Sequence, residues 1–568
     1  MQSVAAEFKI DEDIPEEEVE KAYNEWIKPA SNIPRCSTKR PVLPIKGNII
    51  GSVLSADVFA KYCRLRGANT LYICGTDEYG TATETKALEE GLTPQQICNK
   101  YNKLHAEIYE WFNIKFDHFG RTSTERQTKI AQNIFWELHK RNYILQESVE
   151  QLYCGSCERF LADRFVFGIC PHCQYDDARG DQCDKCGKLI NAPELKEPRY
   201  LPKIEPKLQE WLEKSTSTGQ WTHLGKAITQ SWIKTGLKPR CISRDLKWGT
   251  PVPLEGYENK VFYVWFDAPI GYLSITSEYT EDWEKWWKNP EEVELYQFMA
   301  KDNVPFHSVI FPSCLLGTEQ NYTVVNHLSG ISYLNYEDTK FSKSRGIGVF
   351  GTDCKETSIS SDIWRFYLLF IRPESHDASF CWEDLMNKNN SDLLGNIGNF
   401  INRALTFVSK NFKGVVPEMQ LNEADKLLIA RINLNLQEYI DQMEKLVLRD
   451  AIRNILNIGR LGNLYIQVNE PWVLIKGTPE EKVRAGTIMG LSVNIACLLS
   501  LLLEPYLPVS VASLRSQLNY PAEATLGSAF QRYLAPGHKI GKPSPLFKKI
   551  EPSELEELQK RFQGKQQQ

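Results

Sequence analysis

The stretch LYICGTDEYG, from Leu71 to Gly80, decides the fold. Its first half is a short apolar run and its second half is a polar turn with two glycines, a pattern typical of a β-strand followed by a loop. The preceding residues 48–66 carry apolar side chains at helical spacing, and Gly67 ends that helix. The order helix, strand and glycine-rich turn predicts an α/β fold.

The same alternation continues downstream of this stretch. Thr93 and Pro94 predict the start of a helix, with Thr as the N-cap and Pro at the first helical position. The sequence FDHFG (116–120) predicts a second strand, and Thr122 and Glu125 have the spacing of a capping box. The α/β pattern therefore extends over at least the first quarter of the chain.

Later segments divide the chain further. Strands are expected at 260–266 (KVFYVWF) and at 308–311, whereas the pattern from about Asp384 onward is helical almost throughout. Near the N-terminus, EEEVEKAYNEWI predicts a short helix, and the charged tail after Pro545 is expected to fray. The predicted architecture is an α/β body with a cysteine-rich insertion, followed by an α-helical domain.

Length and composition exclude several classes of protein. A chain of 568 residues exceeds one compact domain, and its 42% hydrophobic and 24% charged residues are those of an ordinary globular protein. We expect no membrane span, because no apolar run has the required length, and no secretory signal, because residues 1–21 are acidic. With a net charge of −5, a nucleic acid would have to bind local basic patches.

Fifteen cysteines in such a chain favour zinc over disulfides. Two CxxC pairs, Cys170–Cys173 and Cys183–Cys186, can place four thiolates around one Zn²⁺ in a closed structural site. The alternative is four buried reduced cysteines. A further pair, Cys154 and Cys157, has no fourth CxxC pair to complete a second site, so we expect one zinc only.

The loop KFSKSRG, from Lys340 to Gly346, combines two lysines with hydroxyl groups and a glycine. Ammonium and backbone N–H groups arranged in this way can bind a triphosphate. A loop of this composition is more often solvated surface. Its place after the second half of an α/β sheet favours phosphate binding, because ligands bind at the carboxyl ends of such strands.

Taken together, the motifs resemble those of eukaryotic cytosolic methionyl-tRNA synthetases, which are class I aminoacyl-tRNA synthetases. KFSKS (340–344) is similar to the family's Lys-Met-Ser-Lys-Ser signature, with Phe341 in place of Met. Further similar stretches follow in family order: CGTDEYGTATETKALEEG (74–91), CISRDLKWGTPVP (241–253), VWFDAPIGYLS (264–274), MAKDNVPFHS (299–308), NFINR (399–403) and VNEPW (468–472). The ordered set extends from about residue 48 to 520, so the resemblance is specific.

The resemblance implies a fold and a division into domains. The fold is a Rossmann-type nucleotide-binding catalytic domain with a zinc-knuckle insertion, followed by an α-helical bundle that binds the anticodon. The expected parts are an acidic extension (1–45), the first Rossmann half (46–150), the insertion (151–225), the second Rossmann half (226–330), the KFSKS loop and stem-contact region (331–385), the anticodon-binding domain (386–540) and a charged tail (541–568).

The resemblance also implies a methionine site. Asp77 matches the family's partner for the methionine ammonium group, where a carboxylate supplies a charge-assisted hydrogen bond. The matching pocket residues are Trp265, Ala268, Pro269, Tyr272 and His307. Aromatic faces suit an unbranched thioether. Without the resemblance, Trp265 and Tyr272 would be taken as ordinary core residues.

The implied reaction joins methionine to ATP. Lys340, Lys343 and Arg244 match catalytic positions that neutralise charge on the triphosphate while the methionine carboxylate attacks the α-phosphorus. The implied ATP-binding set is Gly47, Asn48, Lys340, Ser342, Lys343 and Ser344, with Mg²⁺ on the phosphates and Zn²⁺ in a structural role. The resulting adenylate would pass its methionyl group to the terminal ribose of tRNA.

The implied macromolecular partner is tRNA(Met). Asn396 and Trp472 match positions that recognise the anticodon, where unpaired bases stack on aromatic rings and accept amide hydrogen bonds. The alternative for both residues is ordinary helix packing. The resemblance further implies a cytoplasmic enzyme and membership of a multi-synthetase complex.

One departure from the family bears on activity. A class I synthetase carries a His-x-Gly-His/Asn signature, whereas here Ile45 occupies the position expected for the catalytic His, followed by Gly47 and Asn48. About 20 residues, the length of one strand with its turns, are missing from the pattern there. A second jump lies at Arg199–Tyr200. Either residues were lost from the sequence or the protein lacks them, and in the second case we expect it to be inactive.

Two other functions were weighed. The class I enzymes for leucine, isoleucine and valine carry a large editing insertion, for which residues 150–225 leave little room, and a cysteine enzyme would use zinc to bind its amino acid. A non-catalytic tRNA-binding or scaffold protein is supported by the missing His signature. The presence of Asp77, Arg244 and Lys343 favours the ligase instead.

Overall fold

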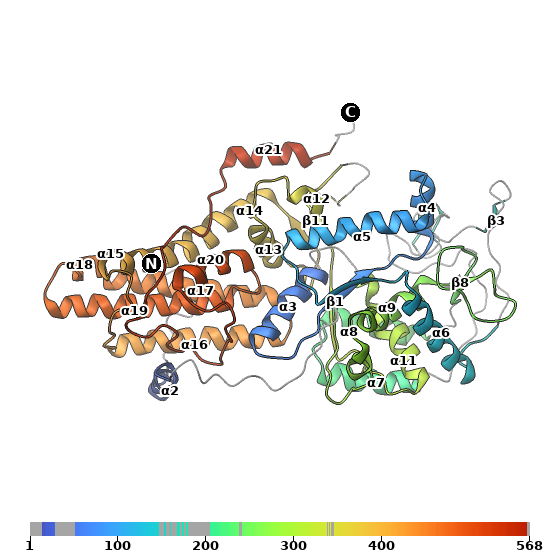
Figure 1. Cartoon of the computed structure of the whole chain (residues 1–568), viewed down its shortest axis with the longest axis horizontal. Coiled ribbons are helices and arrows are strands. Elements are labelled where there is room, and N and C mark those ends of the chain that lie inside the picture. Colours follow the sequence, from blue (N-terminus) through green and yellow to red (C-terminus); the bar gives the residue numbers. More distant parts are fainter. Residues whose placement is uncertain are drawn as a thin grey trace.

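The computed structural model describes residues 14–28, 52–146, 205–237, 241–337, 339, 341 and 346–564, together with the short pieces 153–154, 159–160, 167–170, 173–174 and 178–179. Figure 1 shows an α/β body beside an elongated bundle of helices. The two jumps in the family pattern, at Gly47–Asn48 and Arg199–Tyr200, lie outside the described residues.

The α/β body consists of short parallel strands covered by helices. Its elements, in chain order, are α3 (Leu54–Leu65), β1 (Ile73–Thr76), α4 (Thr81–Glu90), α5 (Pro94–Trp111), β2 (His118–Arg121), α6 (Glu125–Lys140), α7 (Glu205–Thr218), α8 (His223–Thr235), β7 (Ser243–Arg244), β8 (Val261–Phe262), α9 (Val264–Tyr279), η4 (Glu281–Trp283), α10 (Glu284–Trp287), β9 (Tyr296–Ala300), η5 (Lys301–Asn303), the π-helical η6 (Phe306–Ile310), α11 (Phe311–Thr318) and β10 (His327–Ile331).

Strand pairing follows the α/β pattern. Strand β1 pairs in parallel with β2, Ile73 opposite His118, and β9 pairs in parallel with β10, Tyr296 opposite His327. The connections between the members of each pair contain helices, as parallel pairing requires. Strands β7 and β8 form an antiparallel pair, Arg244 opposite Val261. The α/β class predicted from the sequence is confirmed.

Several sequence expectations match individual elements. Helix α5 starts at Pro94, and the Thr93 hydroxyl accepts a hydrogen bond from the backbone N–H of Gln96 in a reciprocal capping box. The predicted N-terminal helix is α2 (Glu16–Trp26), which packs on the bundle. Both follow from local signals, a cap in one case and an amphipathic stripe in the other.

Three local expectations were wrong. The capping box expected at Thr122 does not form: α6 is capped by Thr124, because the Thr122 hydroxyl accepts from the Glu78 backbone N–H instead. The strand expected at 260–266 ends at Phe262, and helix α9 begins at Val264. The strand expected at 308–311 is the helical η6 and the start of α11. Runs of buried aromatic and β-branched residues do not distinguish a strand from a fully buried helix.

The second half of the chain is predominantly helical. After β11 (Leu334–Tyr336), α12 (Gly351–Cys354), α13 (Ser361–Phe370), β12 (Ala378–Phe380) and α14 (Trp382–Asn387), the bundle contains the π-helical η7 (Lys388–Gly398), α15 (Asn399–Asn411), α16 (Glu423–Glu444), α17 (Leu448–Asn469), α18 (Pro471–Leu474), α19 (Pro479–Leu502) and α20 (Pro508–Leu518). Strands β11 and β12 pair in parallel. The long helices α16, α17 and α19 confirm the helical pattern expected from about Asp384 onward.

Helix α19 is the central helix of the bundle. By length and composition alone, α19 could cross a membrane, contrary to the expectation that no apolar run has the required length. Its most apolar window is completely buried by the surrounding helices. A helix that is apolar on all sides is accounted for by burial in a large core, and this is what the packing of α15, α17 and α20 on α19 provides.

The C-terminal tail is not frayed as a whole. Residues Pro552–Phe562 form helix α21, which buries Leu555, Leu558 and Phe562. It packs on α14, at the upper edge of Figure 1. The expectation failed because the tail is charged on average, whereas its apolar residues recur at helical spacing and form one buried stripe.

Candidate functional site

The loop after β1 holds Asp77, the residue predicted to bind an ammonium group. Its neighbour Glu78 is 3% exposed and locks the loop. The Glu78 carboxylate accepts hydrogen bonds from Arg121 Nε at 2.8 Å and from the Thr76 hydroxyl at 2.7 Å, and its backbone N–H donates to Thr122. Asp77 itself is half-buried. A buried, fully engaged carboxylate on one side of Asp77 fixes the backbone from which Asp77 projects.

The loop also contacts the motif that contains Arg244. The Trp248 indole N–H donates to the Glu78 backbone carbonyl at 2.8 Å, and the Trp248 ring meets the Tyr79 ring edge to face. The Glu84 carboxylate, one turn into α4, accepts the backbone N–H of Trp248 at 2.8 Å. Two motifs that lie 170 residues apart in the chain therefore form one unit.

Arg244 lies at the start of this unit, in β7. Its guanidinium sits 3.7 Å from the centre of the Tyr263 ring and donates to the backbone carbonyls of Cys241 and Ser243. Tyr263 is the residue that precedes helix α9. Arg244 is half-buried, and its guanidinium lies beside the N-terminal end of α9, where the helix dipole also favours anions.

Helix α9 carries four of the five predicted pocket residues. Ala268, Pro269 and Tyr272 are buried, and Trp265 is half-buried in the first turn. The Trp265 ring stacks on Phe306 with centroids 3.6 Å apart and planes 6° apart. Phe306 was not among the residues chosen from the sequence. It lies in the quoted stretch MAKDNVPFHS (299–308), directly before His307, but its partner Trp265 lies about forty residues away in the chain.

The fifth pocket residue, His307, meets Tyr272. The Tyr272 hydroxyl lies 3.0 Å from His307 Nε2, and His307 Nδ1 lies 2.7 Å from the Asn303 backbone carbonyl. Because a carbonyl only accepts, Nδ1 carries the proton and Nε2 accepts from Tyr272 in the neutral ring. Burial raises the pKa of Tyr272 well above its usual value, so the hydroxyl remains a donor.

The Asp77 loop and helix α9 are neighbours. A Cβ on Gly80 would lie 3.7 Å from Val264, the first residue of α9, and a Cβ on Gly75 would clash with Ile275 farther along the same helix. Thr250, next to Trp248, donates to the buried Asp267 of α9 at 3.2 Å. Asp77, Arg244 and the pocket residues of α9 thus belong to one contiguous part of the fold.

The segment leading to the KFSKS loop adjoins the same region. Tyr333, just before β11, donates its hydroxyl to Asp302, and Lys301 pairs with Asp377 at 3.1 Å. Phe341 lies between the rings of Tyr336 and Phe350, at centroid distances of 5.5 and 6.0 Å. The predicted ATP-binding residues Gly47, Asn48, Lys340, Ser342, Lys343 and Ser344 lie outside the described residues.

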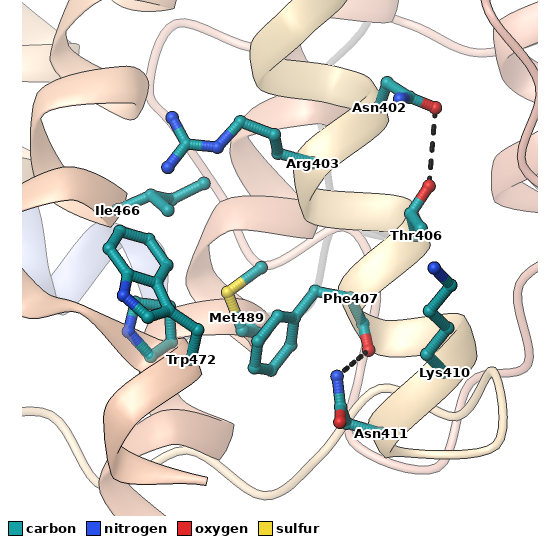
Figure 2. Close-up of a pocket in the computed structure, with 10 residues that line it drawn as sticks. Asn402, Arg403, Thr406, Phe407, Lys410, Asn411, Ile466, Trp472 and Met489 are labelled. Atoms are coloured by element: carbon teal, nitrogen blue, oxygen red, sulfur yellow. Dashed lines mark hydrogen bonds between the residues drawn. The ribbon is translucent and has the colours of Figure 1, made fainter.

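A separate cavity lies at the far end of the helical bundle (Figure 2). It has a volume of about 280 Å³, and its lining comes from helices α15, α17, α18 and α19: Asn402, Arg403, Thr406, Phe407, Lys410, Asn411, Ile466, Pro471, Trp472 and Met489. The Arg403 guanidinium lies 5.6 Å from the centre of the Trp472 ring. A half-buried indole flanked by cationic and amide groups is suited to a flat, anionic ligand.

The structure does not bring Asn396 to this cavity. Asn396 is 9% exposed, donates to the Leu456 carbonyl at 2.9 Å and accepts from Asn463. These bonds tie η7 to α17 inside the bundle. The amide side chains that line the cavity are those of Asn402 and Asn411, and Asn402 and Arg403 both belong to the NFINR stretch.

The cysteine-rich insertion is described only in pieces. Short antiparallel pairs join β3 (Tyr153–Cys154) to β4 (Arg159–Phe160) and β5 (Phe167–Gly168) to β6 (Ala178–Arg179). Cys170 is buried and Cys173 is half-buried, and Gln174 N donates to the Cys170 carbonyl in a tight turn. Cys183 and Cys186 lie outside the described residues. Within the described part of the chain, no group of three or more His, Cys, Asp or Glu side chains is placed to hold a metal ion.

Comparison with protein families identifies both halves. The family described as tRNA synthetases class I (M) matches residues 44–405, which is more than half of the chain. The chain belongs to this family. The family described as the anticodon binding domain of methionyl tRNA ligase matches residues 416–567. A class I catalytic domain is therefore followed by a helical anticodon-binding domain, as the resemblance implied.

Relatives of this class I synthetase include two vertebrate proteins. It is 58% identical over 598 aligned positions to a protein of Xenopus laevis named methionine–tRNA ligase, cytoplasmic. The alignment covers 98% of this chain and 66% of the frog protein. It is also 58% identical to a Homo sapiens protein of the same name, over 97% and 66% of the two chains. The chain thus spans just under two thirds of these relatives. Because the 598 aligned positions cover only 98% of this chain, or about 557 residues, the frog relative carries at least about 40 internal residues that this synthetase lacks.

A solved structure supports the fold of this class I synthetase. The Mycobacterium tuberculosis methionyl-tRNA synthetase, crystallised with methionyl-adenylate, superposes with a TM-score of 0.75 over 90% of this chain and all of that chain. The sequence identity is 20%, so the agreement concerns the fold.

Proposed function

We propose that the protein is a cytoplasmic methionine–tRNA ligase, which activates L-methionine with ATP and transfers it to tRNA(Met). The observation that carries this proposal is the contiguity of the Asp77 loop with helix α9, through Gly80 and Val264. A carboxylate for the methionine ammonium group and an aromatic pair for its thioether then lie in one region of the fold. The names of the vertebrate relatives support the same substrate and compartment.

The aromatic residues account for selectivity toward a thioether. In the proposed site, the side chain of methionine packs against the stacked Trp265 and Phe306, where sulfur–aromatic contact contributes about 0.3–1.5 kcal/mol. Tyr272 and His307 satisfy each other, so neither polar atom needs a partner from the substrate. A competing amino acid with a polar side chain would find no hydrogen-bond partner in this pair, and its polar group would be buried without a partner.

The phosphates would meet positive charge from two directions. Arg244, held over Tyr263 at the N-terminal end of α9, neutralises charge on one side, and Lys340 and Lys343 of the signature loop neutralise it on the other. The attack of the carboxylate on the α-phosphorus needs alignment and charge compensation rather than a covalent enzyme intermediate. Mg²⁺ would enter with ATP and supply further charge neutralisation on the phosphates.

Zinc is proposed for the insertion alone. The donor set fits a structural site, since two of the four thiols, Cys170 and Cys173, lie three residues apart, next to the hydrogen bond from the Gln174 backbone N–H to the Cys170 carbonyl. With Cys183 and Cys186, they would hold one Zn²⁺ and stabilise a segment with little apolar core of its own. The division into seven parts given above and the membership of a multi-synthetase complex are also proposed, on the resemblance to the family.

The cavity beside Trp472 is the proposed site for the anticodon. The Trp472 ring and the Arg403 guanidinium offer stacking surfaces for unpaired bases, and the Lys410 ammonium group offers positive charge for the phosphates. A second candidate function, tRNA binding without catalysis, is favoured by the lack of at least about 40 internal residues relative to the frog protein.

One experiment distinguishes the two functions. Methionine-dependent ATP–pyrophosphate exchange is measured for the chain as given and for a variant that carries the missing segment of the Xenopus laevis relative between Gly47 and Asn48. We expect exchange from the restored variant and a loss of at least about 100-fold in the chain as given, the effect of removing a general charge-stabilising group. No methionine-dependent exchange from a folded restored variant would refute the ligase. Equal rates from both would show that the segment is not needed.

A further inference from the structure

The hairpin that carries Arg244, residues 241–263, is rigid within itself. Strands β7 and β8 pair along it, and just past β7 the Asp245 carboxylate pairs with Lys260 at 2.5 Å. The described contacts of the Arg244 guanidinium, with two backbone carbonyls and the ring of Tyr263, all lie within this hairpin. The place of Arg244 in the molecule therefore depends on what holds the hairpin against the rest of the fold.

Glu84, in the first turn of α4, holds this hairpin from outside. Its Oε1 atom accepts two consecutive backbone N–H groups, from Lys247 at 3.1 Å and from Trp248 at 2.8 Å. Residues 246–249 belong to neither strand, so the carboxylate supplies an acceptor that the strand pairing does not. Hydrogen bonds to an ionised acceptor are roughly twice as strong as neutral ones. The backbone three residues beyond Arg244 is thus fixed on α4.

The other end of the same connection is the Asp77 loop. Asp77 precedes Glu84 by seven residues, and Gly80 between them is the N-cap of α4. The loop is itself bound to the hairpin, because the Trp248 indole donates to the backbone carbonyl of Glu78. One short loop and one helical turn therefore separate the carboxylate proposed to bind the methionine ammonium group from the carboxylate that holds the hairpin.

A second glutamate of α4 shows what such a residue does when it stays at the surface. The Glu89 side chain is 58% exposed and pairs with Lys86 of the same helix at 3.0 Å, a contact that water and salt screen. Glu84 is half-buried, and its described partners are backbone groups 163 and 164 residues away in the chain. The contacts of Glu89 stay within the helix, whereas those of Glu84 reach the hairpin. The two residues therefore make a matched pair for substitution.

We propose that Glu84 is a positioning residue for Arg244, which it keeps at a fixed place relative to Asp77. The inference rests on the proposed function of Arg244 and Asp77. The methionine carboxylate, oriented through the ammonium group at Asp77, attacks the α-phosphorus while negative charge develops beside Arg244. A hairpin that moves with respect to the loop draws the guanidinium away from this charge, so the transition state loses more stabilisation than either bound substrate. Glu84 should therefore influence kcat more than KM.

The first test measures methionine-dependent ATP–pyrophosphate exchange in the full chain with the frog segment restored. We expect Glu84→Ala to lower kcat by about 10- to 100-fold, the factor that corresponds to loss of a hydrogen bond to a charged group. KM for methionine and KM for ATP should each change by less than about three-fold. Glu84→Gln, whose amide oxygen still accepts, should recover most of kcat, and Glu89→Ala should leave kcat unchanged. A kcat for Glu84→Ala within about two-fold of that of the unsubstituted enzyme would overturn the proposal.

A double-variant cycle separates positioning from a general effect on folding. If Glu84 acts through Arg244, then Glu84→Ala should lower kcat by less than about two-fold in an Arg244→Gln background, because the charge that Glu84 positions is already absent. An undiminished loss of kcat in that background would show that Glu84 acts in another way, and the proposal would be wrong.

Amide hydrogen exchange in the chain as given tests the geometry without activity. Exchange of the Lys247 and Trp248 backbone N–H groups, followed by mass spectrometry, should rise by at least about ten-fold in Glu84→Ala and stay unchanged in Glu89→Ala. Unchanged exchange in Glu84→Ala would refute the positioning role, since the carboxylate would then not hold the hairpin. If the restored enzyme shows no pyrophosphate exchange at all, the proposed function fails, while the amide exchange still decides whether Glu84 fixes the hairpin.

Discussion

The buried Arg365 of α13 ties the two halves of the molecule together. Its guanidinium pairs with Asp57 of α3 at 2.7 Å, and both side chains are completely buried. It also donates to the backbone carbonyls of Pro505, Tyr506 and Phe112, at 2.6, 2.9 and 3.0 Å. One side chain thus satisfies a carboxylate and a carbonyl of the α/β body together with two carbonyls of the turn between α19 and α20.

Replacing Arg365 with Met should be severely destabilising. Met has roughly the volume of Arg, so the loss of stability is electrostatic. Asp57 loses one of its two cationic partners, and three backbone carbonyls lose their hydrogen-bond donor. Breaking a buried ion pair costs about 3–5 kcal/mol, because the remaining charge stays out of water. Asp57 retains Lys61 and the Lys115 backbone N–H, which limits the loss to this range. We expect about 3–5 kcal/mol.

A matched control uses an exposed ion pair. Arg453 pairs with Asp450 at 2.8 Å on α17, with side chains 57% and 36% exposed. Arg453→Met should cost no more than about 0.5 kcal/mol, because water and salt screen such pairs. The double variant Asp57→Asn with Arg365→Met removes both charges of the buried pair. It should be less destabilised than the sum of the two single variants.

Native-state amide hydrogen exchange is the suitable assay, since unfolding of a chain with several domains has no single free energy. The opening free energies of α3 and α13 are measured by mass spectrometry in each variant. We expect exchange in both helices to rise by at least about 100-fold in Arg365→Met. A rise of less than ten-fold, or a double variant as unstable as the sum of the singles, would refute the assignment of this pair as the interdomain tie.

Further outcomes follow from the same contacts. Burial lowers the pKa of Lys61 to about 8, against about 10.4 in an unfolded chain. Between these two pH values the unfolded state binds more protons than the folded state, so stability rises with pH. In thermal unfolding, the stability of the wild type relative to Lys61→Met should therefore rise from pH 7 to 10. Trp472→Ala should weaken tRNA(Met) binding by about 1–3 kcal/mol in a filter assay, with methionine-dependent exchange unchanged; equal loss of both would contradict a separate anticodon site. Tyr272→Phe should leave His307 Nε2 without its donor and lower stability by about 1–3 kcal/mol in calorimetry; no change in stability would show that the bond carries no weight.

The sequence predicted those parts of the fold that depend on local signals. Helix α5 follows from the cap at Thr93, and α16 from its spacing of apolar residues. The start of α9 could not be predicted, because KVFYVWF is apolar and β-branched whichever element it forms. The deciding feature is tertiary: α9 is buried on nearly all sides by β1, β2 and α6, so it carries no polar stripe that would reveal a helical period.

The site was predictable to a different degree. Asp77, Trp265 and His307 were identified because they lie in motifs, but their contacts were not, since motifs carry no distances. Glu78 and Phe306 were missed although they adjoin predicted residues. Glu78 gave one usable signal, a carboxylate in an apolar-flanked turn that needs buried partners. Phe306 lay in the quoted stretch MAKDNVPFHS, but the sequence did not show that it stacks on Trp265, because that contact joins two elements.

The jump that the sequence pattern predicts at Gly47–Asn48 precedes helix α3 in the chain, and the described strands of the α/β body form separate pairs. Among the described residues, β1 and β2 form one two-stranded parallel sheet and β9 and β10 form another. Gln297 of β9 is completely buried, and its side-chain amide has no hydrogen-bond partner in the described part of the chain. A buried amide without partners is costly. A strand of the missing segment, inserted ahead of α3, would join the two pairs into one sheet and bring polar backbone groups to that side of β9. We therefore predict that inserting the additional residues of the frog relative at Gly47–Asn48 would stabilise the α/β body through the continuity of its sheet, as well as supply the expected His signature.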